Sequence, residues 1–422
     1  MIILWISNMT FPEALCLLNG EGDLKASGGW MLGLANSISC IPNIQLHIAS
    51  VSPLVSELTV LEGKRIKYYL LPLGKGNKRY NSEYERLWLK VHEIVKPDVV
   101  HLHGTEFSHG LSYLKACGSK NACVSIQGLV SACHCYFYYG ISCNDIIKSS
   151  TPLSLIYGGI LKGAKDFKKR GEVEKEIIRN VPHIIGRTTW DRERTWAINP
   201  RAEYHYCSEI LRREFYEDLS WDYDKCTPHT IFVSQANYPI KGFHMLLRAM
   251  PLVLREFPDA KIRVAGGKIC DVNSLIGLMK LSNYGNLIRR MIKQYDLKNS
   301  IEFLGPLNGA EMREEYLRCN VFVSPSTIEN SPNSIGEAQM LGVPVLASYV
   351  GGVCDMMKGD EYHMYRFEET EMLAYKICEI FEKKKDIDTS KMQQEAQRRH
   401  NVDTIVNDLL QIYEHIYKEN KD

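Results

Sequence analysis

The sequence has no excess of charge of either sign. Its 422 residues include 51 Lys and Arg against 50 Asp and Glu, which gives a formal net charge of +1 at pH 7. A balanced chain has no global field that would attract nucleic acid or a strongly acidic partner. We therefore expect no nucleic-acid partner, and the length predicts two or three domains.

Long apolar runs and a disulfide framework are also missing. The stretch from Ala26 to Ser56 carries no charged residue, but glycine, asparagine and proline interrupt it, whereas a membrane span needs about 20 predominantly apolar residues. The initial MIILWIS has no basic flank and is typical of a first buried strand rather than a signal peptide. Thirteen scattered cysteines favour reduced thiols, so we expect a cytoplasmic protein.

Short apolar runs alternate with helical patterns along the whole chain. Examples are IILWIS, IQLHIAS and DVVHLH in the first half, and TIFVSQ, AKIRVAG and NVFVSP in the second. This alternation predicts βαβ units on parallel sheets. The polar segment FYEDLSWDYDKCTPHT separates the two halves. We expect one α/β domain over residues 1–220, a second over 221–400 and a closing helix over 401–422.

The segment STIENSPNSIGEAQ predicts a helix start between two acidic residues, Glu329 and Glu337. Pro332 suits a first helical position, and Ser331 before it can cap the helix. The first amides of such a helix can bind a phosphate. These amides belong to Asn333, Ser334 and Ile335.

The two carboxylates suit different parts of one ligand. Glu337 can accept hydrogen bonds from a ribose, while Glu329 follows a strand at the edge of the sheet where ligands bind in open α/β folds. The alternative is that each acid only complements the helix dipole. Lys241 follows the strand TIFVS and can reach a diphosphate as a point charge; the alternative is a solvated surface lysine.

The first half offers residues at corresponding strand ends. Gly28 and Gly29 form a glycine-rich turn before a helix, without the full dinucleotide fingerprint. His101 and His103 point to the same side of a strand, and either can line a binding site or be a satisfied core residue. Gln127 ends the next strand.

Two further segments have a structural alternative. The spacing of Cys133, His134, Cys135 and Cys143 lacks a paired Cys-x-x-Cys and does not favour zinc, so we expect no metal site. A basic run is typical of a solvated helix face, or can contact the anionic lipid of an inner membrane surface. Its basic residues are Lys162, Lys165, Lys168, Lys169 and Arg170.

Taken together, DVVHLHG, YPIKGF, IEFLGPL and NVFVSPSTIENSPNSIGEAQMLGVPVLASYVGG resemble glycosyltransferase family 4. The likeness covers nearly the full chain and is most specific where Glu329 and Glu337 match the family's Glu-x7-Glu motif. It implies a GT-B fold, with two Rossmann-like domains facing a cleft and a last helix that crosses back to the first domain. It implies a retaining, metal-independent sugar transfer from a UDP- or GDP-sugar to a glycan or lipid-linked glycan, in cell-surface polysaccharide synthesis, with no other cofactor.

The resemblance also implies roles for single residues. Glu337 corresponds to the ribose ligand, Glu329 to the contact with the donor sugar and Lys241 to the diphosphate lysine. The amides near Ser334 and Ile335 correspond to the phosphate cradle. Gly28 and Gly29 correspond to the loop that meets the phosphates from the first domain.

Two positions depart from the family pattern. Ser234, Gln235 and Ala236 stand where many relatives have an arginine, which leaves the diphosphate with less positive charge unless Arg187 compensates. Gln127 stands where many have a histidine, and His103 is a partial substitute on the acceptor side. Other functions remain open: a nucleotide-sugar epimerase, a phosphorylase, or a non-catalytic nucleotide-sugar-binding protein.

Overall fold

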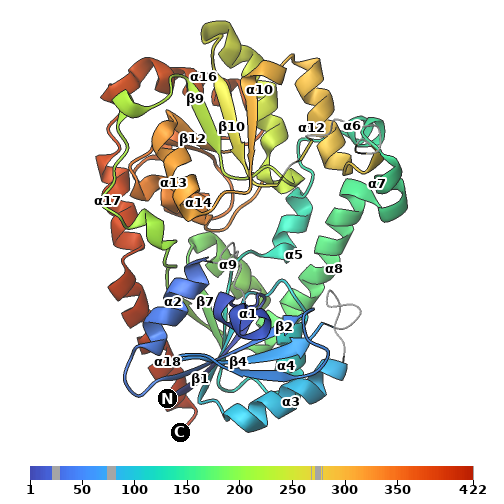
Figure 1. Ribbon diagram of the computed structural model, residues 1–422, viewed down its shortest axis with the longest axis vertical. Coiled ribbons are helices and arrows are strands. Elements are labelled where there is room, and N and C mark those ends of the chain that lie inside the picture. Colours follow the sequence, from blue (N-terminus) through green and yellow to red (C-terminus); the bar gives the residue numbers. More distant parts are fainter. Residues whose placement is uncertain (21–28, 74–81, 268, 271–276, 278, 422) are drawn as a thin grey trace. The chain divides into compact units, whose positions relative to one another are not determined.

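The computed structural model describes residues 1–20, 29–73, 82–267, 269–270, 277 and 279–421 (Figure 1). The chain divides into two compact units. Unit 1 comprises Met1–Ala132, Lys168–Arg212 and His400–Asp422, and unit 2 comprises Cys133–Phe167 and Arg213–Arg399. The expected Gly28 lies outside the described residues.

Unit 1 is built on an eight-stranded sheet in the order β3-β4-β2-β1-β5-β6-β7-β8. All neighbouring strands are parallel except β3 and β4. The strands are β1 (Ile2–Ser7), β2 (Gln45–Ser52), β3 (Thr59–Glu62), β4 (Lys67–Pro72), β5 (Val99–His103), β6 (Ala122–Ser125), β7 (His183–Gly186) and β8 (Glu203–Tyr206). The helices with residues in this unit are α1 (Pro12–Asn19), α2 (Gly29–Ser39), α3 (Glu83–Val95), α4 (His109–Cys117), α5 (Val130–Cys133), α8 (Gly159–Asn180), α9 (Thr189–Ile198) and α18 (Val402–Glu419).

Unit 2 has a six-stranded parallel sheet in the order β11-β10-β9-β12-β13-β14. Its strands are β9 (Thr230–Val233), β10 (Lys261–Ala265), β11 (Ile301–Gly305), β12 (Val321–Ser324), β13 (Val345–Ser348) and β14 (Met364–Tyr365). Its helices are α6 (Cys143–Lys148), α7 (Pro152–Tyr157), α10 (Phe243–Glu256), α12 (Asn283–Gln294), α13 (Gly309–Arg318), α14 (Asn333–Met340), α15 (Val353–Met356), α16 (Thr370–Lys383) and α17 (Ser390–Arg399).

The prediction of two parallel-sheet Rossmann-like domains is confirmed. Each sheet has a switch point, where the strands that follow in the chain are added on the other side of the sheet. The switch point lies between β1 and β5 in unit 1 and between β9 and β12 in unit 2. Ligands in such folds bind beyond the carboxyl ends of the strands at this switch point. Strands β5, β9 and β12 at these points are fully buried, as expected for parallel strands covered on both faces.

The unit boundaries differ from the expected 1–220, 221–400 and 401–422. Residues 133–167 group with unit 2 because α6 and α7 are bonded to the region of α12: Asn283 donates to the carbonyl of Ile146 at 3.0 Å, and Thr151 donates to that of Leu281 at 2.7 Å. Residues 213–220 also group with unit 2, since Phe215 packs on Tyr316 of α13.

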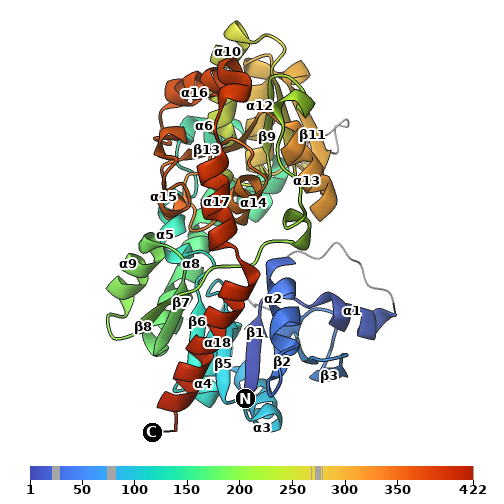
Figure 2. The ribbon, with the colours of Figure 1, turned by 90° about the vertical axis from the view of Figure 1, so that its left-hand side faces the viewer.

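The last helix returns to unit 1. Helix α18 runs beside the sheet of that unit (Figure 2), and its Tyr413 hydroxyl accepts a hydrogen bond from the indole of Trp5 at 2.9 Å. Both residues are fully buried, so the end of the chain is part of the core of unit 1. No helix in the described ranges is both long enough and apolar enough to cross a membrane.

Candidate active site

In unit 2, the segments that follow β9 and β12 meet at the switch point of the sheet. The chain after β9 forms a short 3₁₀ turn, Pro239–Lys241, before α10. The chain after β12 carries Glu329 and leads into α14. The amide of Thr327 donates to the carbonyl of Ile240 at 2.7 Å, so the backbones of the two segments are joined directly.

Gly242 makes this close approach possible. Its φ is +66°, and a Cβ built on it would lie 1.7 Å from the carbonyl oxygen of Pro325. Any side chain at this position would push the turn away from the β12 segment, because a non-bonded contact of that length cannot exist. The glycine of the YPIKGF motif therefore places Lys241 beside the loop that carries Glu329.

Lys241 and Glu329 contact each other. The ammonium Nζ of Lys241 donates to Oε1 of Glu329 at 2.6 Å, and the hydroxyl of Ser326 donates to the same oxygen at 2.9 Å. The two side chains are 20% and 15% exposed. Burial acts to lower the pKa of Lys241, but the Glu329 carboxylate and the nearby Tyr238 outweigh it and raise this pKa above its usual value. Lys241 is therefore a fixed cation at neutral pH.

The backbone of Glu329 is held from the other side by two glycines. The amide of Gly352 donates to the Glu329 carbonyl at 3.0 Å. Gly351 has a φ of +51°, and a Cβ on it would lie 2.0 Å from the same carbonyl oxygen. The paired glycines of the YVGG segment thus fix the loop, so that the Glu329 carboxylate is a preorganised group.

Helix α14 begins one residue later than predicted. Pro332 is its N-cap, with φ −70° and ψ 118°, and the side chain of Pro332 forms no capping hydrogen bond. The prediction of a Ser331 cap with Pro332 at the first helical position is wrong, because the extended ψ of Pro332 keeps it outside the helix. The amide of Ile335 donates to the Pro332 carbonyl at 3.0 Å. Asn333 and Ser334 are thus the first two residues at the positive end of the helix.

The rest of α14 is anchored in the core of unit 2. Ile335 is fully buried in a cluster with Tyr316 and Phe322, and the Tyr316 hydroxyl donates to the carbonyl of Ser334 at 3.0 Å. Glu337 is 4% exposed. A ligand that contacts this carboxylate must displace the little water that reaches it.

In unit 1, His103 ends β5 and lies in an aromatic cluster. Its ring is 3.8 Å from that of His101, 4.3 Å from that of Trp5 and 6.0 Å from that of Trp30. Burial, with a smaller contribution from His101, lowers the pKa of His103 well below its usual value. Within the described ranges neither ring nitrogen of this buried residue has a hydrogen-bond partner.

A small cavity of about 20 Å³ adjoins His103, with Trp30, Arg187 and Glu209 among its lining residues. That volume holds about one water molecule. His101 also lines it, but both of its ring nitrogens are satisfied, by Tyr413 and Ser125, each at 2.6 Å. Of the two histidines, His101 is the core residue and His103 the one with unused hydrogen-bonding capacity.

Gln127 and Arg187 meet at a residue that the sequence did not single out. The Gln127 amide donates to Oε1 of Glu209 at 2.7 Å, and Arg187 forms an ion pair with the same oxygen. Arg187 also donates to the carbonyl of Ile126 at 2.7 Å. Glu209 lies in the segment that follows β8, and an acid shortly after a strand is the signal that would have identified it.

Gly29 opens α2. A Cβ on it would lie 2.9 Å from Cγ of Arg212, so the glycine allows the two segments of unit 1 to pack. Its partner in the predicted turn, Gly28, is outside the described residues.

One family model matches the second half of the chain. Residues 220–399 match the family model described as glycosyl transferases, group 1. These residues contain Lys241, Glu329, Glu337 and the start of α14. The match supports a glycosyltransferase.

Curated relatives are similar over part of the chain. An uncharacterised glycosyltransferase of Methanocaldococcus jannaschii is 31% identical over 128 residues, which are 30% of this chain and 29% of the relative. The gpi3 subunit of the phosphatidylinositol N-acetylglucosaminyltransferase of Schizosaccharomyces pombe is 24% identical over 202 residues, 47% of this chain and 40% of the relative. The chain thus spans less than half the length of these relatives.

Solved structures are similar over nearly the whole chain. Sucrose-phosphate synthase from Thermosynechococcus elongatus gives a TM-score of 0.71 at 16% identity and covers 99% of each chain. The Anabaena protein HepE in complex with UDP gives 0.60 at 13% identity, covering 98% of this chain and 100% of that one. At such identities the likeness establishes the GT-B fold and no more.

Proposed function

We propose that the protein is a retaining, metal-independent glycosyltransferase of family 4 that transfers a sugar from a UDP- or GDP-sugar. The observation that carries the proposal is the contact of Lys241 with Glu329 at the switch point of unit 2, beside the start of α14. The group 1 family match covers this region. A cation and a helix N-terminus suit a diphosphate, while a buried carboxylate suits sugar hydroxyls.

The donor lies along this edge in the proposal. Glu337 accepts from the ribose, and Lys241 and the amides of Asn333 and Ser334 contact the diphosphate. Glu329 accepts from hydroxyls of the donor sugar. In the ligand-free protein the Glu329 carboxylate compensates the charge of Lys241, and the diphosphate takes over that role when it binds.

The chemical step is a front-face displacement. The acceptor oxygen forms a bond to the anomeric carbon while the bond from that carbon to the diphosphate oxygen breaks. The acceptor proton passes to the departing diphosphate, which keeps the electron pair of the broken bond. Lys241 and the helix amides stabilise the charge that develops there, as fixed donors do in electrostatic catalysis.

Unit 1 binds the acceptor in this proposal, a glycan or lipid-linked glycan used for cell-surface polysaccharide. His103, with its unused nitrogens, and Gln127 are the acceptor-side residues. Glu209, which accepts a hydrogen bond from Gln127, is an alternative acceptor-side residue.

Contact with the inner membrane surface is part of the proposal. Leu155, Ile156 and Tyr157 at the end of α7 are 76%, 74% and 66% exposed. Leu161 and Lys162 follow on α8 and are also exposed. Exposed apolar side chains next to lysine suit insertion at an anionic lipid headgroup layer, and a lipid-linked acceptor would be found there.

Mass spectrometry of purified protein incubated with a panel of UDP- and GDP-sugars tests the proposal. A glycosyltransferase yields nucleoside diphosphate with a glycosylated acceptor, or free sugar when water replaces the acceptor. An epimerase yields an isomeric nucleotide sugar, and a phosphorylase acts only with inorganic phosphate. A binding protein leaves every donor intact, which would overturn the proposal.

A further inference from the structure

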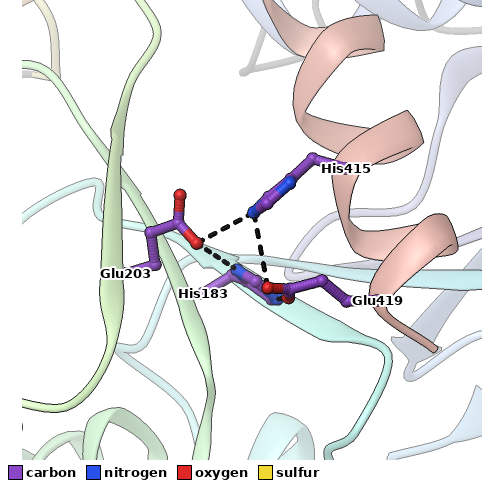
Figure 3. Close-up of side chains that lie close together, drawn as sticks. All are labelled: His183, Glu203, His415 and Glu419. Atoms are coloured by element: carbon purple, nitrogen blue, oxygen red, sulfur yellow. Dashed lines mark hydrogen bonds and ion pairs between the residues drawn. The ribbon is translucent and has the colours of Figure 1, made fainter. Parts of the chain in front are cut away.

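A cluster of two histidines and two glutamates lies at one edge of unit 1, away from the residues discussed above. His183 begins β7 and Glu203 begins β8, and the two are register partners on adjacent parallel strands. His415 and Glu419 lie four residues apart on α18, so their side chains project from the same face of the helix. One ligand atom from each residue lies within 4.8 Å of the other three (Figure 3).

The separations of these atoms are close to those of a tetrahedral metal site. Nε2 of His415 is 2.9 Å from Oε2 of Glu203 and 3.6 Å from Oε1 of Glu419. Nε2 of His183 is 3.1 Å from Oε2 of Glu419. Four ligands bound at zinc distances of about 2.0–2.2 Å lie roughly 3.3–3.6 Å apart at the corners of a tetrahedron. The four ligand atoms lie within 4.8 Å of one another, so the side chains would have to draw together to reach that arrangement.

A fifth residue orients the buried ring. The Nδ1 of His183 lies 3.1 Å from Nε2 of His205, which leaves Nε2 of His183 directed at the cluster. A hydrogen bond to the second ring nitrogen is what fixes the orientation of metal-bound histidines in proteins. His183 is 3% exposed, whereas the side chains of Glu203, His415 and Glu419 are 50%, 42% and 52% exposed. The cluster is therefore anchored in the core but open to entry of an ion.

We propose that His183, Glu203, His415 and Glu419 bind one zinc ion that attaches α18 to the edge of the unit 1 sheet. Imidazole nitrogen combined with carboxylate oxygen suits zinc and disfavours magnesium and calcium, which prefer oxygen alone. Four protein ligands leave no open position, which is the pattern of a structural rather than a catalytic zinc.

The location supports a structural role. His183 and Glu203 are the first residues of their strands, whereas His103 and Arg187 lie at the carboxyl ends of β5 and β7. The cluster therefore lies at the amino ends of the strands and the candidate acceptor residues lie at the carboxyl ends of strands in the same sheet. Without a metal, three of the four side chains are half exposed, and polar contacts between exposed groups contribute little in water.

Calorimetric titration with Zn²⁺ of protein without a histidine tag tests the proposal. We expect one tight Zn²⁺ site in the chain. His415→Gln and Glu419→Gln should each weaken its affinity for Zn²⁺ by at least about 10²-fold. Both residues are half exposed, so their replacement leaves the core intact. His205→Gln removes only the orienting ring and is expected to weaken binding by roughly 10–100-fold. His229→Gln, which breaks a single His-Asp pair in unit 2, is the matched control and keeps full affinity.

Two further readouts separate this site from thiols, since Cys16, Cys40, Cys135 and Cys143 are exposed. Bound Co²⁺ should show the visible bands of nitrogen and oxygen ligands without a thiolate charge-transfer band. Zn²⁺ should raise the melting temperature, EDTA should reverse the change, and Mg²⁺ should have no effect. Equal Zn²⁺ affinity in wild type, His415→Gln and Glu419→Gln, or a thiolate spectrum that is the same in all three, would overturn the proposal.

Discussion

Lys241 and Glu329, 88 residues apart in the chain, form a hydrogen-bonded ion pair of 2.6 Å at the switch point of the unit 2 sheet. The pair joins the end of β9 to the end of β12, and both backbones are held by glycines that tolerate no side chain. The charge of Lys241 is thereby kept at a fixed position before any ligand arrives.

Lys241→Ala should lower turnover more than donor affinity. The ammonium acts mainly on charge that develops on the departing diphosphate, so its loss should reduce kcat and kcat/KM equally. Steady-state kinetics with the preferred donor checks this. A change confined to KM would assign Lys241 to ground-state binding instead.

Gly242→Ala should disrupt the site. The positive φ alone costs about 1–3 kcal/mol for a non-glycine residue, and the added Cβ would also meet the carbonyl of Pro325. Gly305→Ala is the matched control in the same unit, since Gly305 has a φ of +80° with no atom within 4 Å of the added Cβ. The melting temperature and the rate of sugar transfer should both fall more in Gly242→Ala than in Gly305→Ala. Equal losses in the two variants would mean that the close approach of Gly242 to Pro325 is unimportant.

Glu337→Ala should weaken binding of the nucleoside diphosphate while unit 2 stays folded, because Ile335 and Tyr316 still anchor α14. Calorimetry with UDP and GDP measures this. Unchanged affinity would remove Glu337 from the ribose site.

Sugar transfer should survive EDTA, since in the proposal Lys241 and the helix amides compensate the charge of the diphosphate without a metal ion. Assays well below the melting temperature keep this separate from any loss of stability through the proposed zinc site. Activity that EDTA abolishes and only Mg²⁺ or Mn²⁺ restores would refute the metal-independent step.

Acid should destabilise unit 1 through His101. Burial lowers the pKa of His101 to about 3, while an unfolded histidine titrates near 6.5, so the unfolded state binds the proton first. The contribution of His101 to the free energy of unfolding should be constant above about pH 6.5 and should fall by about 1.4 kcal/mol for each pH unit from there down to its folded pKa of about 3. His101→Gln should show a smaller loss between pH 7 and pH 5 in denaturant melts; an unchanged slope would contradict the assignment.

The sequence predicted the two parallel sheets, and it predicted polar residues at the carboxyl ends of the unit 2 strands, for physical reasons. Buried parallel strands appear as short apolar runs, and ligands in such folds bind beyond the carboxyl ends of the strands, where Lys241 and Glu329 lie. Their direct contact was not predictable, because it depends on β9 and β12 being neighbours, which is set by packing. The Ser331 cap was wrong because the backbone of Pro332 decides where α14 begins.

Other features could not be predicted from the sequence, because they join residues that lie far apart in the chain. Glu209 links Gln127 and Arg187 through an ion pair and a hydrogen bond that no local pattern encodes. The zinc cluster combines His183 with Glu419, which no spacing rule connects. Short-range patterns identify donors and acceptors, whereas the fold alone decides which of them meet.

The kinetics of Glu329→Gln test the central claim most directly. Glutamine keeps the shape and can still accept from Lys241 and Ser326, so the fold should be unchanged, but it removes the charge that supports the donor sugar as positive charge develops at the anomeric carbon. We predict transfer reduced by roughly 10²-fold or more, with UDP or GDP binding nearly as in wild type. Near-normal transfer together with a lowered melting temperature would show that Glu329 only stabilises the loop, and would contradict the account.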